Sequence, residues 1–217
     1  MMLETQTLKP THDGRRLKGR RTREEILSTA ACMASQEGLE GLTIGKLARR
    51  TGMSKSGLFA HFGSKEDLQI AVTDYAASIF RERVIKPALH EDDPLAQLTA
   101  VTDGWVSYLE ERVFPGGCFF GNASLEFGSR PGPVRDRLRY WMRQLTRHME
   151  DLVEKARCQG RASPKADPVQ LVFELHALVQ EANYSFQLMD DKKAFQLARR
   201  GIRARLGQIS TQDLENR

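Results

Sequence analysis

Residues 43–62 read TIGKLARRTGMSKSGLFAHF, and this stretch predicts two short helices joined by a tight turn. Thr43 and Ser54 each precede a short run with helical spacing of apolar residues. A hydroxyl at that position accepts a hydrogen bond from a free backbone N–H of the first helical turn. Gly52 separates the two runs, because glycine adopts at little cost the positive φ that ends a helix. Two short helices, a short linker and a glycine in the turn define a helix-turn-helix.

The second predicted helix carries two apolar anchors with polar residues between them. Leu58 and Phe62 are spaced by one helical turn, so both are expected to face inward. The residues that this spacing leaves on the outside are Lys55, Ser56, Gly57, Phe59 and His61. In a helix-turn-helix the second helix enters the major groove of DNA, and its N-terminal residues contact base edges. We therefore expect this helix to contact duplex DNA, and the alternative is a surface helix with two core contacts.

A leading helix is predicted before this motif. Thr22 and Glu25 form a capping box, in which the hydroxyl and the carboxylate each accept a hydrogen bond from a free backbone N–H. A helix is therefore expected to begin at Thr22 and to end at the glycines Gly38 and Gly41. Its apolar stripe is Ile26, Leu27, Ala30, Met33 and Ala34.

The excess positive charge of the chain lies in its first third. Residues 1–65 hold 12 Lys and Arg against 6 Asp and Glu, whereas the remaining residues hold 21 against 22, from totals of 33 and 28. This asymmetry predicts a polyanion partner for one end of the molecule. Residues 1–21 are expected to be a disordered basic arm that enters an adjacent minor groove, with Arg20 and Arg21 as its candidate DNA contacts. A solvated tail without a partner is the alternative.

The rest of the chain reads as helices separated by glycine and proline. A second capping signal, Ser64 with Asp67, predicts a fourth helix that ends at Pro87. Later helices are predicted at residues 94–113, 134–158, 168–189 and 190–206, with a short apolar segment at 118–127. Since no window alternates as a strand does, we predict an all-α fold. The expected parts are residues 1–21 as the arm, 22–65 as a three-helix helix-turn-helix domain, and 66–217 as a larger helical domain.

Residues 23–68 resemble the N-terminal domain of the tetracycline-repressor (TetR) family of bacterial regulators. In REEILSTAACMASQEGLEGLTIGKLARRTGMSKSGLFAHFGSKEDL, the matching features are the leading helix, the G-x-x-x-x-T-I step, the S-K-x-x-L-F-x-H-F run and the S-K-E-D-L start of the fourth helix. The resemblance implies a homodimer that binds a double-stranded DNA operator. It also implies that residues 66–217 bind a small-molecule effector and form the dimer.

The resemblance further implies a set of DNA contacts. They are Thr43 and Lys65 on phosphates, Lys55 and Ser56 in the major groove, and Phe59 and His61 near the DNA backbone. Two positions depart from the family pattern. The family often has tyrosine where Phe59 stands, and the tyrosine hydroxyl usually reaches a phosphate. It also often has glycine where Ser56 stands, whereas the glycine of this chain is Gly57.

The larger domain contains candidate effector contacts. Residues 114–127 are apolar and glycine-rich and hold one thiol, one amide and one carboxylate. Apolar walls with a few polar groups are typical of ligand sites between helices, and equally of a core with tight helix crossings. The candidates are Trp105, Tyr108, Cys118, Phe119, Asn122, Glu126, Trp141 and His176, with His148 as a further one. Cys118 also follows Gly117 at an expected helix start, where a thiol can have a lowered pKa, so a redox or electrophile sensor is an alternative.

The last two predicted helices are candidates for the dimer interface. Each has an apolar stripe, and two such pairs related by a two-fold axis would make a four-helix interface. The candidate residues are Leu175, Val179, Phe186, Phe195 and Ile202. The alternative is that both stripes are buried in the core of one subunit.

Composition argues against several other classes. No apolar run is long enough to span a membrane, and the N-terminus lacks the apolar segment of a signal peptide. Three widely separated cysteines fit the reducing cytoplasm better than a disulfide framework. No zinc-ligand spacing, catalytic triad order or phosphate loop is present, so we expect no metal, no cofactor and no enzymatic activity. The expectation is a cytoplasmic, dimeric, ligand-responsive repressor of a near-palindromic operator, and a DNA-binding regulator without a small-molecule ligand is the alternative.

Overall fold

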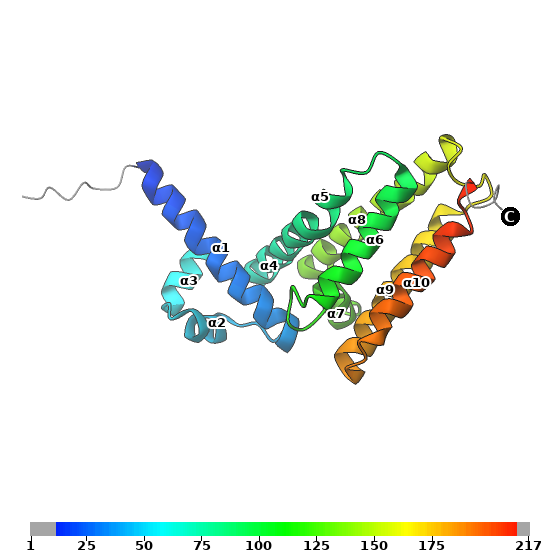
Figure 1. Cartoon of the computed structure of the whole chain (residues 1–217). Helices are drawn as coiled ribbons and strands as arrows, with labels where there is room; N and C mark the ends of the chain where they lie inside the picture. Colours follow the sequence, from blue (N-terminus) through cyan, green and yellow to red (C-terminus); the bar gives the residue numbers. More distant parts are fainter. Residues whose placement is uncertain (1–11, 212–217) are drawn as a thin grey trace, which may run out of the picture.

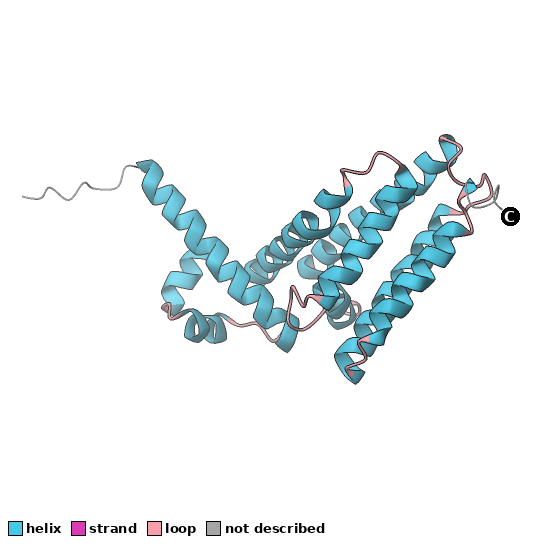
Figure 2. Cartoon of the chain, viewed as in Figure 1, coloured by secondary structure: helices cyan, strands magenta, loops and turns pink. Residues whose placement is uncertain are grey.

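In this computed structural model residues 12–211 are described, and they are helical almost throughout (Figures 1 and 2). The helices are α1 (His12–Glu37), α2 (Ile44–Thr51), α3 (Lys55–Phe62), α4 (Lys65–Phe80), η1 (Arg81–Ile85), α5 (Lys86–Ala88), α6 (Pro94–Glu110), α7 (Phe119–Phe127), α8 (Pro133–Cys158), α9 (Pro168–Met189) and α10 (Lys193–Gly207). Within residues 12–211 the extended backbone pairing is limited to an isolated bridge between Ala162 and Ser210. The predicted all-α fold with an N-terminal helix-turn-helix is confirmed.

The ends of α2 and α3 are set by the residues that the sequence pattern indicates. The Thr43 hydroxyl accepts a hydrogen bond from the Lys46 backbone N–H at 3.2 Å, and the Ser54 hydroxyl accepts one from the Gly57 N–H at 3.1 Å. Gly52 ends α2 with a φ of 67°, a left-handed conformation that glycine adopts at little cost. These caps fix the lengths of both helices and the sharp turn between them.

Two apolar side chains anchor α3 to the rest of the N-terminal unit. Leu58 and Phe62 are only 0% and 5% exposed, and they pack in one core with Leu47 of α2 and Ile26 of α1. Full burial of one such side chain contributes about 2 kcal/mol relative to leaving it in water. The predicted inward orientation of both anchors is confirmed.

The helix start predicted at Thr22 is wrong, because α1 begins at His12 and Thr22 lies inside it. Residues 12–21 are therefore helical rather than a disordered arm, and residues 1–11 lie outside the described part of the chain. Arginine, lysine and leucine are good helix formers. A helix whose C-terminal half is held by core packing can therefore extend through such residues, since adding a turn costs far less than starting one.

The helix that follows the N-terminal unit connects it to the rest of the molecule. Figure 1 shows α4 running from the three-helix unit into the C-terminal bundle, and α4 contacts both α1 and α8. The helical path predicted to end at Pro87 ends one residue later, at Ala88: the π-helical turn η1 continues it after Phe80, and the short α5 completes it. In this wide turn the Lys86 N–H bonds to the Arg81 carbonyl. The change of hydrogen-bond pattern accommodates Pro87, which has no N–H to donate.

The C-terminal part is a helical bundle. Helices α6, α8, α9 and α10 pack around a core that includes Trp105, Met149, Leu152 and Phe195, and α9 and α10 lie side by side at one edge (Figure 1). The short helix α7 contacts both α1 and α8, so it lies where the N-terminal unit meets the bundle. Both α4 and α7 therefore join the two parts of the molecule.

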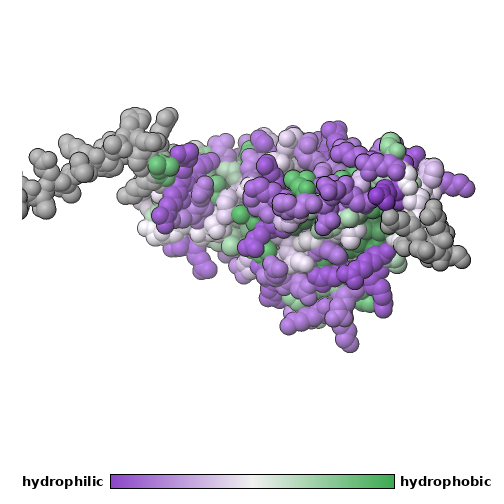
Figure 3. Space-filling model, turned by 45° about the horizontal axis from the view of Figure 1, so that its top comes forward, coloured by the Kyte–Doolittle hydropathy of each residue, from purple (hydrophilic) through white to green (hydrophobic). Residues whose placement is uncertain are grey.

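Most of the large apolar side chains of the described residues are buried, and a minority are exposed. The face drawn in Figure 3 is largely hydrophilic, and its hydrophobic patches are small and separated. Across residues 12–211, no helix combines the length and the apolar character that a membrane span requires.

Candidate functional site

The predicted DNA-facing residues of α3 all lie at the surface. Lys55 and Ser56 are exposed, Gly57 and His61 are half-buried, and Phe59 is 48% exposed. Phe59 is not among the residues that make up or pack against the hydrophobic core. The face between the two anchors is thus available to a partner, and it combines a cation, a hydroxyl and an aromatic ring.

Neighbouring cations extend the positive charge around this face. The side chain of Lys55 runs beside α2, where its Cε lies 3.6 Å from the position that a Cβ on Gly45 would occupy. Arg49 and Arg50 in the last turn of α2 are also exposed. A patch of cations on one end of a molecule attracts polyanions and speeds their association.

Arg23 of α1 holds the C-terminal end of α3. Its guanidinium donates a hydrogen bond to the His61 carbonyl and stacks over the Phe62 ring, with 4.5 Å between the guanidinium carbon and the ring centroid. The carbonyl groups of a last helical turn lack partners within the helix, so a cation stabilises them. The sequence does not predict this contact, because no local pattern links Arg23 to a residue 38 positions away.

The residues predicted to contact phosphates lie in different surroundings. Thr43 is half-buried, and its hydroxyl can still donate to a phosphate while it accepts from the Lys46 N–H. Lys65 is not a free cation, because its ammonium lies 2.7 Å from Glu40 Oε1. Arg20 is exposed on the first turns of α1, and Arg21 forms an ion pair of 3.2 Å with Glu25. Both members of the Arg21–Glu25 pair are highly exposed, so the pair contributes little to stability and Arg21 stays available to a polyanion.

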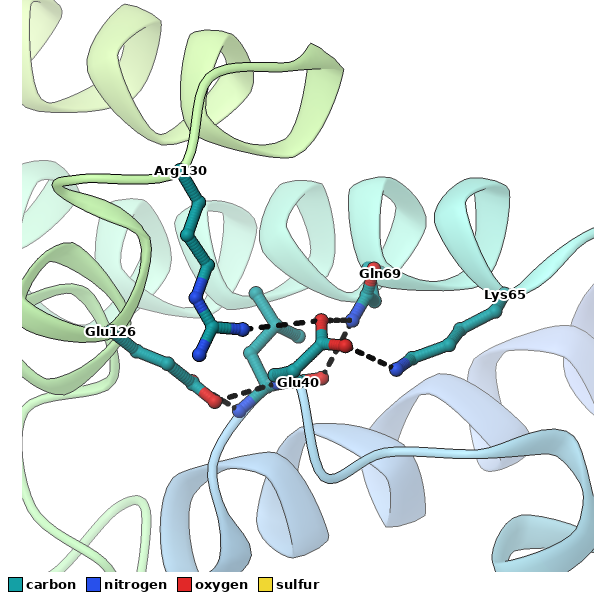
Figure 4. A network of polar contacts seen from close by, with 6 residues as sticks. Glu40, Lys65, Gln69, Glu126 and Arg130 are labelled. Carbon is teal, nitrogen blue, oxygen red and sulfur yellow. Dashed lines mark hydrogen bonds and ion pairs between the residues drawn. The ribbon is translucent and has the colours of Figure 1, made fainter.

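A carboxylate of α7 binds the loop between α1 and α2. Glu126 accepts hydrogen bonds from the backbone N–H groups of Leu39 at 2.8 Å and Glu40 at 2.9 Å (Figure 4). Gly38 has a φ of 83°, and a Cβ added there would lie 2.9 Å from Glu126 Oε1, so only glycine lets the loop approach so closely. Glu126 is one of the predicted effector contacts, and here its carboxylate is used in this junction between the two parts of the molecule, so an effector contact stays a prediction.

A second carboxylate, that of Glu40, completes this junction. We call its contacts with Lys65, Gln69 and Arg130 the Glu40 network. In Figure 4 the Glu40 side chain reaches Lys65 at 2.7 Å, Gln69 at 3.2 Å and Arg130 at 3.9 Å. The hydrogen bond from Lys65 and then that from Gln69 hold the pKa of Glu40 below its usual value. Gln69 also donates to the Leu39 carbonyl at 2.9 Å. The loop is therefore tied to α4 and, through Arg130 and Glu126, to the C-terminal part.

A cavity of about 180 Å³ lies between α4, α6, α7 and α8. Five of the predicted effector contacts line it together: Trp105, Tyr108, Cys118, Phe119 and Trp141. The further candidate His148 lines it as well. Several wall residues were not predicted, because their spacing along the helices is that of ordinary core residues. They are Phe80, Ile85, Phe120, Met142 and Leu145. Arg81 and Gln144 complete the lining and are exposed, so the cavity reaches the surface between α4 and α8.

Two predicted effector contacts lie elsewhere. The Asn122 amide donates to the Gly116 carbonyl at 2.8 Å and so stabilises the loop before α7. His176 packs edge-on against Trp105, with 5.3 Å between ring centroids, and is not among the residues that line the cavity. Both residues line an open groove between α7 and α9 instead. This groove shares Phe120 and Met142 with the cavity, so a role of Asn122 and His176 in effector binding stays a prediction.

The surroundings of Cys118 oppose the sensor alternative. Cys118 caps α7, and its sulfur accepts hydrogen bonds from the Gly121 N–H at 3.3 Å and the Gln180 amide at 3.6 Å. The side chain is only 3% exposed, and burial raises the pKa of the Cys118 thiol despite these donors. A reactive cysteine needs a populated thiolate and solvent access. The predicted helix start is confirmed, but the thiol has neither property.

The residues predicted to form a dimer interface are enclosed by the subunit itself. Their exposed fractions are 0% for Leu175, Val179 and Ile202, 1% for Phe195 and 5% for Phe186. This packing of α9 and α10 against each other and against α6 fits the alternative of a core within one subunit, and an interface role of these five residues stays a prediction. A different apolar set is exposed on one face of α9 at helical spacing: Val169, Phe173, Tyr184 and Leu188, each between 56% and 70% exposed.

The same chain segments match known proteins. The family model described as "Bacterial regulatory proteins, tetR family" matches residues 26–72, and that described as "Tetracyclin repressor-like, C-terminal domain" matches residues 94–202. The HTH-type transcriptional repressor AcnR of Corynebacterium efficiens is 37% identical over 70 residues, which are 32% of this chain and 37% of that protein. The sequence match thus spans well under half of that relative.

Solved structures cover nearly the whole chain. A TetR transcriptional regulator from Chloroflexus aurantiacus superposes with a TM-score of 0.83 at 26% identity, covering 89% of this chain and 98% of the other. The structure of AibR in complex with isovaleryl coenzyme A and operator DNA gives a TM-score of 0.69 at 22% identity, with 87% and 98% coverage. The second likeness is one of fold.

Proposed function

Because the C-terminal family model alone covers half of the chain, the chain belongs to the TetR family of DNA-binding transcriptional regulators, and we propose that it is a dimeric, effector-controlled repressor of a near-palindromic operator. The observation that carries the proposal is the outward polar face of α3, which two buried anchors hold in place. A repressor relative, AcnR, is 37% identical over 70 residues of this chain. A regulator of this kind acts on the chromosome, so we place it in the cytoplasm.

In the proposed complex α3 lies in the major groove. Lys55 and Ser56 near its N-terminus contact base edges, while Phe59 and His61 lie beside the DNA backbone. Thr43 at the start of α2 and Arg20 and Arg21 on α1 bind phosphates. Lys65 is already paired with Glu40, so it contributes less to phosphate binding than a free lysine would.

The dimer is proposed to form through the exposed face of α9. Val169, Phe173, Tyr184 and Leu188 make an apolar stripe on the side of the bundle away from the α9–α10 contact. Exposed apolar patches of this kind mark interaction sites. A two-fold axis along this stripe would pair the same face of two copies and present two α3 helices to one DNA duplex.

The effector is proposed to bind in the cavity and to act on α4 and α7. Phe80 near the end of α4 and Phe119 at the start of α7 both line the cavity, while the opposite ends of these helices hold Lys65 and Glu126 in the junction with the N-terminal unit. An effector that favours one position of these helices shifts the population of α3 orientations. AibR, which has the same fold, was solved with both a coenzyme A thioester and operator DNA.

Selection of bound sequences from a random DNA pool tests the proposal. We expect a near-palindromic sequence whose half-sites lie about one or two helical turns apart, enriched at both low and high salt. Enrichment of a single, non-repeated site would contradict the dimeric mode of binding. Enrichment that disappears at high salt would reduce the proposal to non-specific DNA binding. If no small molecule in a metabolite screen releases the selected operator, the chain is a regulator without an effector.

A further inference from the structure

The size and walls of the cavity limit its occupant to a compact apolar body. Its volume of about 180 Å³ slightly exceeds the roughly 150 Å³ of an engineered apolar cavity that binds benzene. Six aromatic side chains contribute to the walls: Phe80, Trp105, Tyr108, Phe119, Phe120 and Trp141. A single ring with a small substituent therefore fits, whereas a fused polycyclic compound does not.

The interior of the cavity is uncharged. Burial raises the pKa of the Tyr108 hydroxyl and of the Cys118 thiol, so both remain protonated. Burial, followed by repulsion from Lys155, lowers the pKa of His148, so its imidazole is neutral near pH 7. The cation of the lining, Arg81, is exposed at the opening. A buried carboxylate or ammonium on the occupant would lose its hydration without gaining a partner of opposite charge.

One polar donor in the walls lacks an acceptor at good hydrogen-bonding geometry. The Trp105 side chain is 1% exposed, and among the described residues its indole N–H has only the Cys118 sulfur as a near acceptor, a contact that acts to lower the pKa of that thiol without meeting the geometry of a hydrogen bond. An indole N–H donates only, and an unpaired buried donor is costly. The Nε2 atom of His148 on the facing helix α8 is likewise buried without a partner. The other indole of the chain, that of Trp141, is satisfied by Asp74 at 2.7 Å.

Building on the proposed effector site, we infer that the cavity takes a small, uncharged ring compound bearing one oxygen acceptor, such as a ketone, ester or phenol oxygen, which accepts a hydrogen bond from Trp105. The ring fills the aromatic walls, and the oxygen replaces the Cys118 sulfur as the acceptor beside the Trp105 N–H, which requires a small shift of the walls because that N–H is shielded in the unbound chain. His148 adds a second polar contact for an oxygen placed between α6 and α8.

Three probes of equal size test the chemical class on the full chain. Acetophenone carries a neutral oxygen, isopropylbenzene has the same shape without it, and benzoate carries a charge. Both tryptophans of the chain line the cavity, so quenching of intrinsic fluorescence reports binding directly. We expect acetophenone to bind and benzoate to bind at least tenfold more weakly. Benzoate binding as tightly as acetophenone would overturn the requirement for a neutral ligand.

The variant W105F isolates the hydrogen bond, and W141F is the matched control because its indole N–H is already bonded to Asp74. W105F should weaken acetophenone binding about tenfold and change isopropylbenzene binding less than about twofold. W141F should change both affinities alike. The change in affinity between the wild type and a variant does not depend on the hydration of the free probe, so it can be compared between the two probes. Equal losses for both probes in W105F would overturn the inference.

A measurement on the unmodified chain covers the case in which W105F does not fold. The two indole N–H signals are resolved by nitrogen-15 NMR, and that of Trp105 should move downfield with acetophenone but not with isopropylbenzene. A Trp105 signal that responds to both probes alike would contradict the inference. If no probe binds while an unrelated metabolite releases the operator, the chemical class is wrong and the proposed function stands. If nothing binds and the operator is still bound, both the class and the effector role fail.

Discussion

At Phe59, α3 lacks the hydroxyl oxygen of the tyrosine that the family often has at this position. The ring is 48% exposed on the proposed DNA face, so a para hydroxyl can be added without disturbing the core. Phe59→Tyr should tighten operator binding about threefold to tenfold, because a hydrogen bond to a charged phosphate contributes about 1 kcal/mol or more. Fluorescence anisotropy with a labelled operator measures this change. Unchanged or weaker binding would place Phe59 away from the phosphate backbone.

Glu126 is a residue whose importance is visible only in three dimensions. Removing its carboxylate leaves two backbone N–H groups of the α1–α2 loop without their acceptor. Glu126→Ala should therefore lower the free energy of unfolding by about 1–3 kcal/mol, and Glu126→Gln, which keeps one acceptor oxygen, by less. Chemical denaturation measures both values. Leu125→Ala on the same helix is the control, because Leu125 is 88% exposed. Equal stability of the wild type and Glu126→Ala would contradict a structural role for the junction.

At the scale of the element, helix ends are predictable where one side chain specifies them. Thr43, Ser54 and Gly52 determine the ends of α2 and α3 through local hydrogen bonds and φ preference, so the sequence is enough. The start of α1 is different, because a helix extends through any run of good helix formers once packing has stabilised part of it. A capping pattern inside such a run, as at Thr22, is then not used.

The faces of α9 show what helical periodicity cannot decide. The stripe with Leu175 and Val179 and the stripe with Phe173 and Tyr184 are both apolar, so the pattern indicates two faces that avoid water. Only the packing of α9 against α6 and α10 shows that the first stripe is covered within the subunit and the second is not. The junction at Glu126 escapes prediction for a related reason, since its partners are backbone groups 86 and 87 positions away.

The exposed stripe of α9 carries the prediction about assembly. Phe173→Glu combined with Tyr184→Glu should convert the dimer to a monomer, because like charges on a two-fold interface face each other. Sedimentation velocity measures the mass in solution, and operator affinity should fall in parallel. Leu89→Glu is the control, since Leu89 is 56% exposed on a different helix end. A double variant that remains dimeric would place the interface on another surface.

At the scale of the whole molecule, two half-buried histidines predict how the free energy of unfolding depends on pH. Burial lowers the pKa of both imidazoles, and repulsion from Lys155 lowers that of His148 further. Protonation of either histidine is therefore less favourable in the folded chain than in the unfolded chain. As pH falls below the ordinary value of 6.5, the unfolded chain binds protons that the folded chain does not, and stability decreases. Thermal melts should show a flatter profile below pH 6.5 for the His148→Gln, His176→Gln variant. An unchanged profile would show that other groups control acid unfolding.

The distribution of charge gives the molecule two ends with different tasks. The N-terminal end carries the excess of Lys and Arg together with the outward face of α3, whereas the C-terminal end is nearly neutral and contains the cavity. Helices α4 and α7 reach both ends. In the proposed mechanism a signal from the cavity reaches α3 through α4, α7 and their contacts at Glu40 and Glu126.

The most direct test of DNA reading by α3 compares Lys55→Ala with Lys165→Ala, which removes an exposed lysine from a loop of the C-terminal part. Affinities for the selected operator and for random DNA are measured at two salt concentrations. Lys55→Ala should lose about tenfold or more on the operator and much less on random DNA, while Lys165→Ala changes neither. Equal losses on both DNAs in the Lys55 variant, or none, would contradict base reading by α3.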